Sequence, residues 1–408
     1  MKNENSYDVM IMGGGAAGFF AAIHHALSSP SDSVVIIEKR SQVLGKVKIS
    51  GGGRCNVTHA CFDPFVLKDH YPRGGKALLS LFLKFQPQDT INWFESRGVP
   101  LKVESDNRVF PVSNESQSII DCLIETAKTC GVHIWTDCTI KSLSKPNTLF
   151  EVLLANQQRH YFKKCVIASG SHPQGYDIAR SFGHTIIDPI PSLFTFKIKD
   201  KDLQLLSGLS VQDTAVWCTG DKKSLQSGPT LITHQGLSGP AIIKLSAWQA
   251  IAFHQANYHV TITIDWLATL SQADTRVILE QFKQNHTGKY IHSLSPFNQI
   301  PLRLWHYLLA RLDVNKNITW SACSAKLLLR IIDTLKLCSF QVTSKSPFKD
   351  EFVTCGGIPL PEINFKNMES KYCSGLHFVG EVLNIDGVTG GFNFQNAWST
   401  GYVSALTS

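Results

Sequence analysis

Apolar runs in the first forty residues are separated by glycines and by a stretch with helical spacing. Residues 7–12 read YDVMIM and lead directly into three glycines. Residues 16–28 carry apolar side chains three and four positions apart, and residues 33–38 form a second apolar run that ends in an acid. Two strands joined through a helix form a βαβ unit, which predicts a parallel sheet.

The same plan recurs as far as residue 191, and the pattern changes beyond it. Residues 78–99 have helical spacing that stops at a glycine, and residues 116–137 predict a helix, a glycine cap and a short strand. Residues 163–175 predict a buried strand that ends in a glycine loop. From about residue 192, short apolar strands alternate with turn residues, as in an antiparallel unit, and a helix is expected to start at Pro240.

A strand and a glycine-started helix return at the end of the chain, within residues 375–405. The sequence therefore predicts an α/β fold, with a Rossmann-like dinucleotide-binding domain formed by both ends of the chain. The expected divisions are residues 1–191 for the first part of this domain, 192–269 for an inserted antiparallel β domain, 270–342 for a basic helical subdomain and 343–408 for the second part.

Composition is typical of a globular protein and argues against several classes. The chain has 408 residues, of which 43% are hydrophobic and 17% charged, so two or three domains are expected. Its apolar runs are shorter than the ~18 residues of a membrane span, and a strand explains the start of the chain better than a secretory leader. We expect a cytoplasmic protein with no membrane partner. Eleven cysteines contain no Cys-x-x-Cys pair, so reduced thiols and no metal site are expected.

Positive charge is concentrated in the segment from residue 276 to residue 350. This segment holds eleven Lys and Arg residues against four acids, and the difference equals the +7 net charge of the whole chain. A solvated basic face explains the pattern, and so does a surface for a polyanion, with RNA as the first candidate. The basic residues are Arg276, Lys283, Lys289, Arg303, Arg311, Lys316, Lys326, Arg330, Lys336, Lys345 and Lys349.

The glycines after the first strand match a dinucleotide-binding turn. Gly13, Gly15 and Gly18 have the G-x-G-x-x-G spacing, which allows a tight turn, close approach of the backbone to a pyrophosphate, and close packing of helix on strand. Glu38 ends the next strand about 20 residues after Gly18, where an acid binds a ribose hydroxyl. The context predicts a bound dinucleotide.

A second glycine-rich loop, KVKISGGGRCNVTH at residues 46–59, is neither a P-loop nor a second dinucleotide turn. Near the other end, residues 375–393 read GLHFVGEVLNIDGVTGGFN and predict a strand, an acid, a loop with Asp386 and a helix start. A helix N-terminus stabilises negative charge, as on a reduced flavin, and Glu381 is placed to accept bonds from ribityl or ribose hydroxyls. NAD needs no such additional regions, whereas the longer FAD does, so FAD is the predicted cofactor.

These segments resemble the BaiN/RdsA family of NAD(P)/FAD-dependent oxidoreductases, also described as aminoacetone-oxidase-like or YhiN-like flavoproteins. The segments GGGAAG, SGGGRCNVTH, THQGLSGPAIIKLS and the run from TCGGIPLPEINF to GGFNFQNAWSTGYVSA carry the resemblance. It implies a two-part FAD domain with an inserted β-barrel and helical region. It also implies cofactor contacts for Gly13, Gly15, Ala16, Ala17, Gly18, Glu38, Lys39, Lys46, Ser50, Gly52, Gly53, Arg54, Cys55, Asn56, Ile140, Ser169, Gly170, Gly380, Glu381, Asp386, Gly391, Phe392 and Asn393.

Three residues are candidate proton donors. Cys55 lies in the second glycine loop, where a thiol either donates a proton near the flavin or packs as a small side chain that shapes the loop. His59 follows the same loop, and His234 lies just before the segment GLSGPA. A structural role is the alternative for both histidines. Arg54 is predicted to act as a fixed cation beside phosphate or flavin.

The resemblance implies an FAD-dependent oxidoreductase that transfers a hydride from NAD(P)H through flavin to an electron-poor double bond. The chain has no second nucleotide turn, so NAD(P)H is expected to dock transiently. The family implies three substrate types: steroid-like bile acids, aminoacetone, and uridine of ribosomal RNA that is reduced to dihydrouridine. A small-molecule reductase or oxidase and a non-catalytic flavin-binding module therefore stay open beside the RNA reading, for which Lys326, Arg330 and Lys336 are the expected phosphate contacts.

Overall fold

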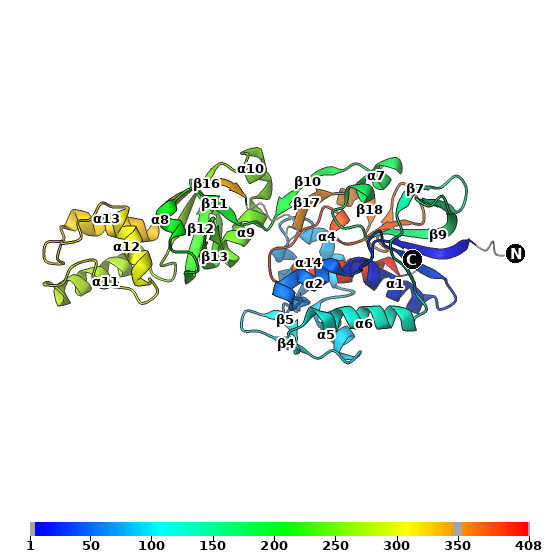
Figure 1. Ribbon diagram of the computed structural model, residues 1–408, viewed down its shortest axis with the longest axis horizontal. Helices are drawn as coiled ribbons and strands as arrows, with labels where there is room; N and C mark the ends of the chain where they lie inside the picture. Colours follow the sequence, from blue (N-terminus) through cyan, green and yellow to red (C-terminus); the bar gives the residue numbers. More distant parts are fainter. Residues whose placement is uncertain (1–4, 346–352, 407–408) are drawn as a thin grey trace. The chain divides into compact units, whose positions relative to one another are not determined.

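The computed structural model describes residues 5–345 and 353–406. The chain divides into two compact units, the first made of residues 1–191 with 353–408 and the second of residues 192–352 (Figure 1). The first unit therefore contains both ends of the chain.

A parallel sheet forms the centre of the first unit. Its parallel strands are β6 (His133–Trp135), β2 (Val34–Ile37), β1 (Ser6–Met12), β9 (Arg159–Ile167) and β20 (Leu376–Phe378), side by side in that order. Strands β1 and β2 contain fully buried runs of Val, Ile and Met, as expected of a sheet covered on both faces. Because these strands are parallel, their carboxyl ends lie along one edge of the sheet, which is where ligands bind in such folds.

Antiparallel strands extend this sheet on the side of β9 that is opposite β1. The pair β18 (Ile363–Asn364) and β19 (Glu369–Ser370) continues it beyond β20. Strand β8 (Phe150–Leu154) pairs with β9 and with β7 (Ile140–Ser144).

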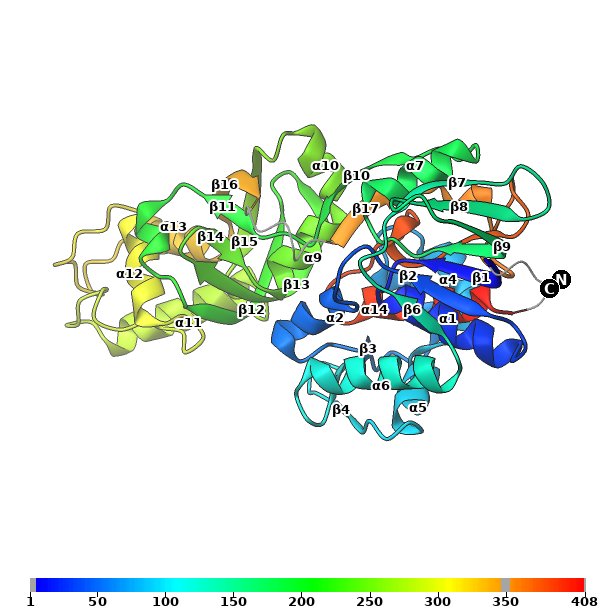
Figure 2. The same cartoon turned by 45° about the vertical axis from the view of Figure 1, so that its right-hand side comes forward.

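Two long helices pack against each other beside this sheet (Figure 2). Helix α1 (Ala16–Ser28) follows the first glycine turn, and α14 (Phe392–Ser404) is the last helix of the described chain. A Cβ added at Gly401 would lie 3.0 Å from the carbonyl oxygen of Ala17, so glycine allows the two backbones to approach closely. Helix α6 (Ser116–Thr129) precedes β6, as the sequence predicts.

Shorter elements complete the first unit. One helical stretch was expected over residues 78–99, but the structure has two helices, because Pro87 starts a new one. Gln86 and Asp89 form a capping box around that proline, which fixes the break. The elements are α2 (Gly45–Ile49), η1 (Ser50–Gly53), β3 (Thr58–His59), α3 (Pro64–Leu67), η2 (Lys68–His70), α4 (Gly75–Phe82), α5 (Pro87–Glu95), β4 (Leu101–Val103), β5 (Arg108–Pro111), α7 (Pro173–Ser181), β10 (Ile187–Ser192), β17 (Val353–Gly357), η3 (Leu360–Glu362) and η4 (Gly380–Val382).

The second unit contains a closed barrel. Its strands run in the order β11 (Phe196–Ile198), β14 (Gly236–Ser238), β13 (Asp221–Thr233), β12 (Ser210–Cys218), β15 (Val260–Asp265) and β16 (Cys338–Lys345). The sequence-based boundary at residue 343 falls inside β16, so this part of the domain division is corrected. The sequence does not indicate that this segment belongs to the barrel, because β16 lies far along the chain from the other strands. It pairs with both β15 and β11 and so closes the barrel.

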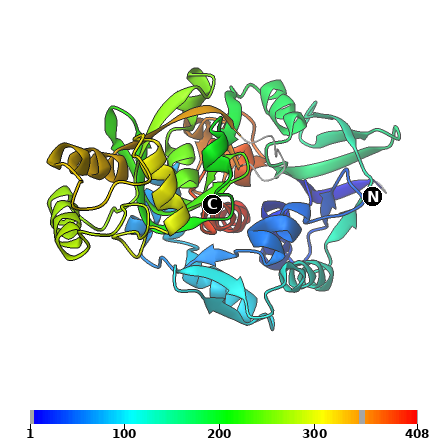
Figure 3. The same cartoon turned by 60° about the vertical axis from the view of Figure 1, so that its left-hand side comes forward.

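Helices cover and extend the barrel (Figure 3). Helix α9 (Pro240–Trp248) begins at the expected proline, α8 (Lys201–Gln204) and α10 (Ala250–Gln255) are short, and α11 (Gln272–Asn285), α12 (Leu302–Ala310) and α13 (Ala325–Lys336) form the helical part. One continuous apolar core joins this part to the barrel, and it includes Trp266, Trp305 and Trp320. None of the helices seen in residues 5–345 and 353–406 is both long and apolar enough to cross a membrane.

Candidate cofactor site

The first glycine turn contains two glycines that close packing requires and one glycine that faces open space. Gly13 has φ +109°, and a Cβ there would lie 2.6 Å from the carbonyl oxygen of Ala168. A Cβ at Gly18 would clash with the carbonyl oxygen of Gly13. At Gly15, by contrast, no atom of the described residues lies within 4 Å of the place a Cβ would take. This opening at the start of α1 fits a pyrophosphate, which the first amide groups of the helix, including those of Ala16 and Ala17, would bind.

Glu38 is held at the end of β2 by backbone groups of the same turn. Its Oε2 accepts a hydrogen bond from the amide of Gly14 at 2.8 Å, and its Oε1 accepts one from the amide of Arg40 at 3.0 Å. The adjacent Lys39 places its Nζ 2.5 Å from Nε2 of His172, the residue that caps α7. Burial, and then the charges of Lys39 and Arg40, lower the pKa of His172. Glu38 is therefore positioned beside the first turn, as a ribose-binding acid requires.

The second glycine loop has an unusual backbone. Gly51, Gly52 and Gly53 have φ of +58°, +69° and +84°, a left-handed run that glycine adopts readily. A Cβ at Gly51 would lie 2.9 Å from the amide nitrogen of Asn56, whereas Gly52 and Gly53 face open space. The buried Oδ1 of Asn56 has no hydrogen-bond partner in the described residues. An exposed glycine pair beside an unpaired polar atom fits a ligand that the loop would hold.

An ion pair joins the second loop to the end of β20. Lys46 Nζ lies 2.6 Å from Oε2 of Glu381, whose other oxygen accepts from the amide of Thr354 at 2.9 Å. Gly170 has φ +59°, and a Cβ there would lie 3.6 Å from that same Oε2. The structure therefore brings together Lys46, Gly170 and Glu381, which are more than a hundred residues apart along the chain.

The first turn also meets the loops after β9 and β20. The Cα of Ser169 would lie 3.3 Å from a Cβ added at Gly13, and a Cβ at Gly380 would lie 2.8 Å from that of Ala17. The amide of Gly380 donates to Oγ1 of Thr400 in α14 at 3.0 Å. The ends of three parallel strands thus converge at the start of α1, the arrangement expected of a dinucleotide site.

Arg54 and Ser50 are engaged within the protein. The guanidinium of Arg54 pairs with Glu104 at 2.7 Å and lies 3.9 Å above the ring centre of Phe110. Ser50 Oγ donates to the carbonyl of Val47 at 2.8 Å. Both side chains therefore brace the second loop against its own neighbours, and a phosphate contact for Arg54 stays a prediction.

Two residues near the start of α14 have partners that the sequence did not indicate. Asp386 is fully buried and forms a two-pronged ion pair with Arg73. Asn393 donates to the carbonyl of Gly387 at 3.0 Å and accepts from its amide at 2.8 Å. Both side chains shape the loop that leads into α14, and their contacts with a cofactor stay a prediction. Arg73 lies some three hundred residues before Asp386, so no local pattern signals the pair.

Aromatic rings gather around the first residue of α14. Phe392 stacks on His59, with ring centres 4.6 Å apart, and on His70, with ring centres 4.4 Å apart. The hydroxyl of Tyr71 donates to the carbonyl of Phe392 at 2.6 Å. A Cβ at Gly391 would lie 2.5 Å from the carbonyl oxygen of Thr58, so β3 packs directly on the helix start. His59 is therefore part of this cluster, and His70 joins it without any sequence signal.

Ile140 and the two other proton-donor candidates have distinct settings. The carbonyl of Ile140 accepts from the side-chain amide of Gln174, so an adenine contact through this backbone stays a prediction. Cys55 is fully buried with φ +60°, and burial raises the pKa of its thiol to about 12. This burial favours the loop-shaping alternative for Cys55. His234 is exposed in the turn between β13 and β14 of the second unit, and its role as a proton donor stays a prediction.

The basic segment is partly neutralised within the second unit. Lys336 is buried, pairs with Asp265 at 2.7 Å and donates to two backbone carbonyls, so it is not a surface phosphate contact. Arg276 pairs with Glu280, and Arg311 lies 3.9 Å from Asp200. Lys289, Lys316, Lys326 and Arg330 are exposed and have no carboxylate within ion-pair distance in the described chain. Lys349 and Asp350 lie outside the described residues.

Almost the whole sequence matches one protein family. The family model described as "HI0933-like protein Rossmann domain" matches residues 7–407. The chain belongs to this family. Its relatives include the 3-dehydro-bile acid delta(4,6)-reductase of Clostridium scindens, which is 26% identical over 407 residues, 97% of this chain and 97% of the relative. They also include the ribosomal RNA dihydrouridine synthases of Escherichia coli and Haemophilus influenzae, which are 27% and 28% identical, and each match covers 98% of this chain and 97% of the relative.

Solved structures share the fold at low identity. The 3-ketosteroid delta1-dehydrogenase of Sterolibacterium denitrificans matches with a TM-score of 0.52 and 11% identity over 98% of this chain and 99% of that chain. A flavocytochrome c3 fumarate reductase matches with a TM-score of 0.51 and 15% identity over 98% of this chain and 78% of that chain. The family and its relatives identify the chain as an FAD-dependent oxidoreductase, as the sequence predicted, and the solved structures show that it shares their fold.

Proposed function

We propose that this HI0933-like protein uses NAD(P)H to reduce the electron-poor carbon–carbon double bond of uridine in ribosomal RNA. The observation that carries the proposal is the full-length similarity to two proteins named ribosomal RNA dihydrouridine synthase. Converting uridine to dihydrouridine adds a hydride and a proton across one double bond conjugated to a carbonyl. A bound FAD supplies the hydride transfer in such reactions.

The residues of the first unit supply binding and orientation. The opening at Gly15 and the start of α1 would receive the pyrophosphate of a bound FAD, and Glu38, which lies beside them, would bind the ribose. Glu381 lies just after β20 and is paired with Lys46, so an acid and a cation would be available to contact a bound cofactor. The start of α14 would stabilise developing negative charge, because the first amides of a helix have no partner within the helix. His59 and His70, stacked on Phe392 at that helix start, are the candidate proton donors.

An RNA substrate also needs cations for its phosphates. Lys326 and Arg330 lie four residues apart on α13 and are both exposed, so they project from the same side of the helix. Lys289 and Lys316 add charge elsewhere in the helical part. These residues replace the buried Lys336 as the proposed phosphate contacts.

The test is an assay of the FAD-loaded protein with unmodified ribosomal RNA and either NADH or NADPH. Dihydrouridine formation is measured by mass spectrometry of the digested RNA. The double change Lys326→Glu and Arg330→Glu is expected to weaken RNA binding at least about tenfold and to flatten its salt dependence, because phosphate contacts release counterions. Lys223→Glu, an exposed lysine of β13 outside the segment, is the matched control. Absence of dihydrouridine with both donors would contradict the proposal.

A small-molecule double-bond reductase is the second candidate. It is favoured by the similarity to the bile acid reductase, which covers the two chains as fully as the RNA enzymes do. The same assay with a 3-dehydro-bile acid that carries a conjugated double bond distinguishes the two candidates. If NAD(P)H fails to bleach the flavin, or no acceptor restores its colour, both enzymes are excluded in favour of a flavin-binding module.

A further inference from the structure

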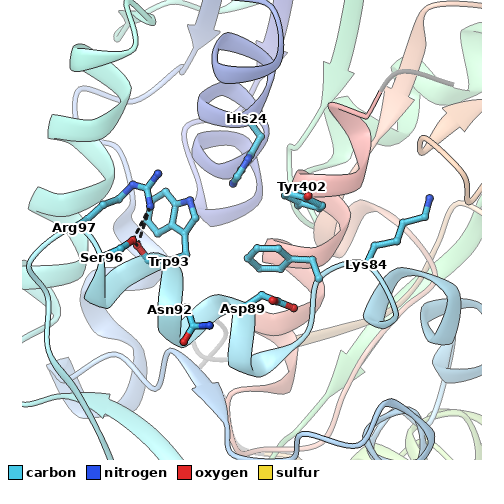
Figure 4. A pocket seen from close by; sticks show the side chains of 9 residues that line it. His24, Lys84, Asp89, Asn92, Trp93, Ser96, Arg97 and Tyr402 are labelled. Atoms are coloured by element: carbon cyan, nitrogen blue, oxygen red, sulfur yellow. Dashed lines mark hydrogen bonds between the residues drawn. The ribbon is translucent and has the colours of Figure 1, made fainter.

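A pocket in the first unit lies toward the far ends of α1 and α14, away from the glycines that precede these two helices. Its volume is about 400 Å³, within the range of small-molecule sites. Figure 4 shows side chains reaching into it from α1, from α5 and its flanking loops, and from the end of α14. His24 lies about 12 Å along α1 from its start, and Tyr402 about 15 Å along α14 from its start, at a rise of about 1.5 Å per residue. The cofactor site therefore does not account for this pocket.

Aromatic side chains form one part of the pocket wall. Phe85 and Tyr402 stack with ring centres 4.7 Å apart, and Trp93 lines the pocket from α5. The fully buried Phe20 supports them, with ring centres 4.8 Å from Trp93 and 5.3 Å from Phe85. Edges of rings that are already fixed by packing suit a flat ligand, because they lose little freedom when it binds.

Two buried ring nitrogens at this pocket have no partner in the described residues: Nε2 of His24 and Nε1 of Trp93. Figure 4 shows the His24 ring directed from α1 into the space between Trp93 and Tyr402. Burial, and then the charge of Arg97, lower the pKa of His24 to about 3. The imidazole is therefore neutral near pH 7, while the indole can only donate. A purely apolar ligand would leave both nitrogens unpaired, which costs free energy.

Two cations stand at the same pocket. The guanidinium of Arg97 lies 4.0 Å from the ring centre of Trp93, and its Nη1 donates to the carbonyl of Trp93 at 2.9 Å. Lys84 Nζ donates to the carbonyl of Lys366 at 3.0 Å. Both groups keep further donors for an anion. Among the described residues of the lining, Asp89 is the one acid, and its Oδ2 accepts a hydrogen bond from the amide of Gln86 at 2.8 Å.

We propose that this pocket binds a nucleotide, with its base against Phe85, Trp93 and Tyr402 and its phosphate on Lys84 and Arg97. A free phosphate would leave the aromatic walls unused, and a hydrocarbon would leave the cations and ring nitrogens unused, whereas a nucleotide uses all of them. Asn92 accepts from Gln88 through its Oδ1 at 2.9 Å, which leaves its amide hydrogens for an acceptor on the base. The proposal uses no residue of the cofactor site, so it stands whichever substrate the enzyme reduces.

A base and a phosphate occur both in a free nucleotide and in a single strand of RNA. The test therefore distinguishes these two ligands. The full-length protein is saturated with FAD, so that the cofactor site is filled. UMP and AMP are then titrated by calorimetry, and a labelled oligouridine is titrated by fluorescence polarisation. Ribose 5-phosphate, which lacks a base, is the probe for the contribution of the rings and is expected to bind at least about tenfold more weakly.

Two variants and one control identify the pocket. Lys84→Glu removes a phosphate contact, and Ser96→Trp fills the rim from the exposed position that caps the end of α5. Each is expected to weaken nucleotide binding at least about tenfold, because the first variant loses a charge-assisted contact and the second loses the space for the ligand. Lys76→Glu makes the same charge change on the exposed side of α4 and is expected to leave binding unaltered.

Each outcome decides the proposal. Mononucleotide binding that both variants weaken supports a nucleotide site. Binding of oligouridine alone, weakened by both variants, supports an RNA strand as the natural ligand. No binding of any probe, or binding that the two variants and the Lys76→Glu control change equally, would overturn the proposal.

Discussion

At the scale of single residues, Cys55 shows how burial can make a reactive side chain a poor candidate for proton transfer. Its thiol is fully buried, and its amide donates to the carbonyl of Ser50 at 3.0 Å across the second glycine loop. Burial raises its pKa to about 12. The thiol therefore stays protonated near neutral pH, and its small volume in a left-handed backbone position fits a loop-shaping role better than proton transfer.

Cys55 is expected to resist alkylation in the native protein. At pH 8 a thiol with this pKa is ionised in only roughly one molecule in 10⁴, and the buried sulfur is also shielded from the reagent. Treatment with iodoacetamide followed by peptide mass spectrometry should leave Cys55 unmodified while the partly exposed Cys138 reacts. The urea-unfolded protein, in which both should react, is the control. Rapid labelling of native Cys55 would restore it as a candidate acid.

At the scale of elements, the sequence predicts the first glycine turn well because its requirements are local. Gly13, Gly15 and Gly18 lie within six residues, between a strand and a helix that the apolar pattern already indicates. The same locality explains what could not be predicted. The pairs Arg73 with Asp386 and Lys46 with Glu381 join residues about three hundred positions apart, and no local pattern encodes such partners.

Substitution by alanine should have different effects on stability at two glycines of this turn. Gly15 has extended backbone angles and open space, so Gly15→Ala is expected to change the free energy of unfolding of the FAD-free protein by less than about 0.5 kcal/mol. It should still weaken FAD binding, because the methyl group enters the space meant for the pyrophosphate. Gly18→Ala should destabilise the FAD-free protein by about 1–3 kcal/mol, because its methyl group clashes with the carbonyl of Gly13.

Urea unfolding of the FAD-free proteins and FAD titration of each variant measure the two effects separately. Equal losses of stability in both variants would show that Gly15 is also a packing glycine. Unaltered FAD binding in Gly15→Ala would place the pyrophosphate elsewhere.

At the scale of the whole molecule, apolar patterning predicts the α/β core and the antiparallel insertion, but not how the barrel closes. Strand β16 lies beyond three helices in sequence, and its own segment gives no sign that it pairs with β11 and β15. The net charge shows a similar limit. A sum over residues 276–350 counts Lys336 as surface charge, whereas the folded chain buries it against Asp265. Composition therefore predicts how much charge a segment has, but not which charges reach solvent.

Buried histidines give the folded chain a whole-molecule sensitivity to acid. Burial lowers the pKa of His24 and of His25 to about 3, from 6.5 when exposed. Below pH 6.5 the unfolded chain binds protons at these two histidines that the folded chain does not bind. The free energy of unfolding therefore decreases as the pH is lowered from about 6.5 to 3. Each histidine contributes about 1.4 kcal/mol per pH unit in this range, and the two together contribute about 3 kcal/mol per unit.

Urea unfolding of the FAD-free protein at pH 7, 6 and 5 measures this slope. His25→Gln removes one of the two buried imidazoles and is expected to reduce the slope by about 1.4 kcal/mol per pH unit. His133→Gln, which changes an exposed histidine at the start of β6, is the matched control for the loss of a ring. A stability that rises as the pH is lowered from 7 to 5 would contradict the neutral state of the buried pair. Equal slopes in the parent protein and in His25→Gln would assign the acid sensitivity to other groups.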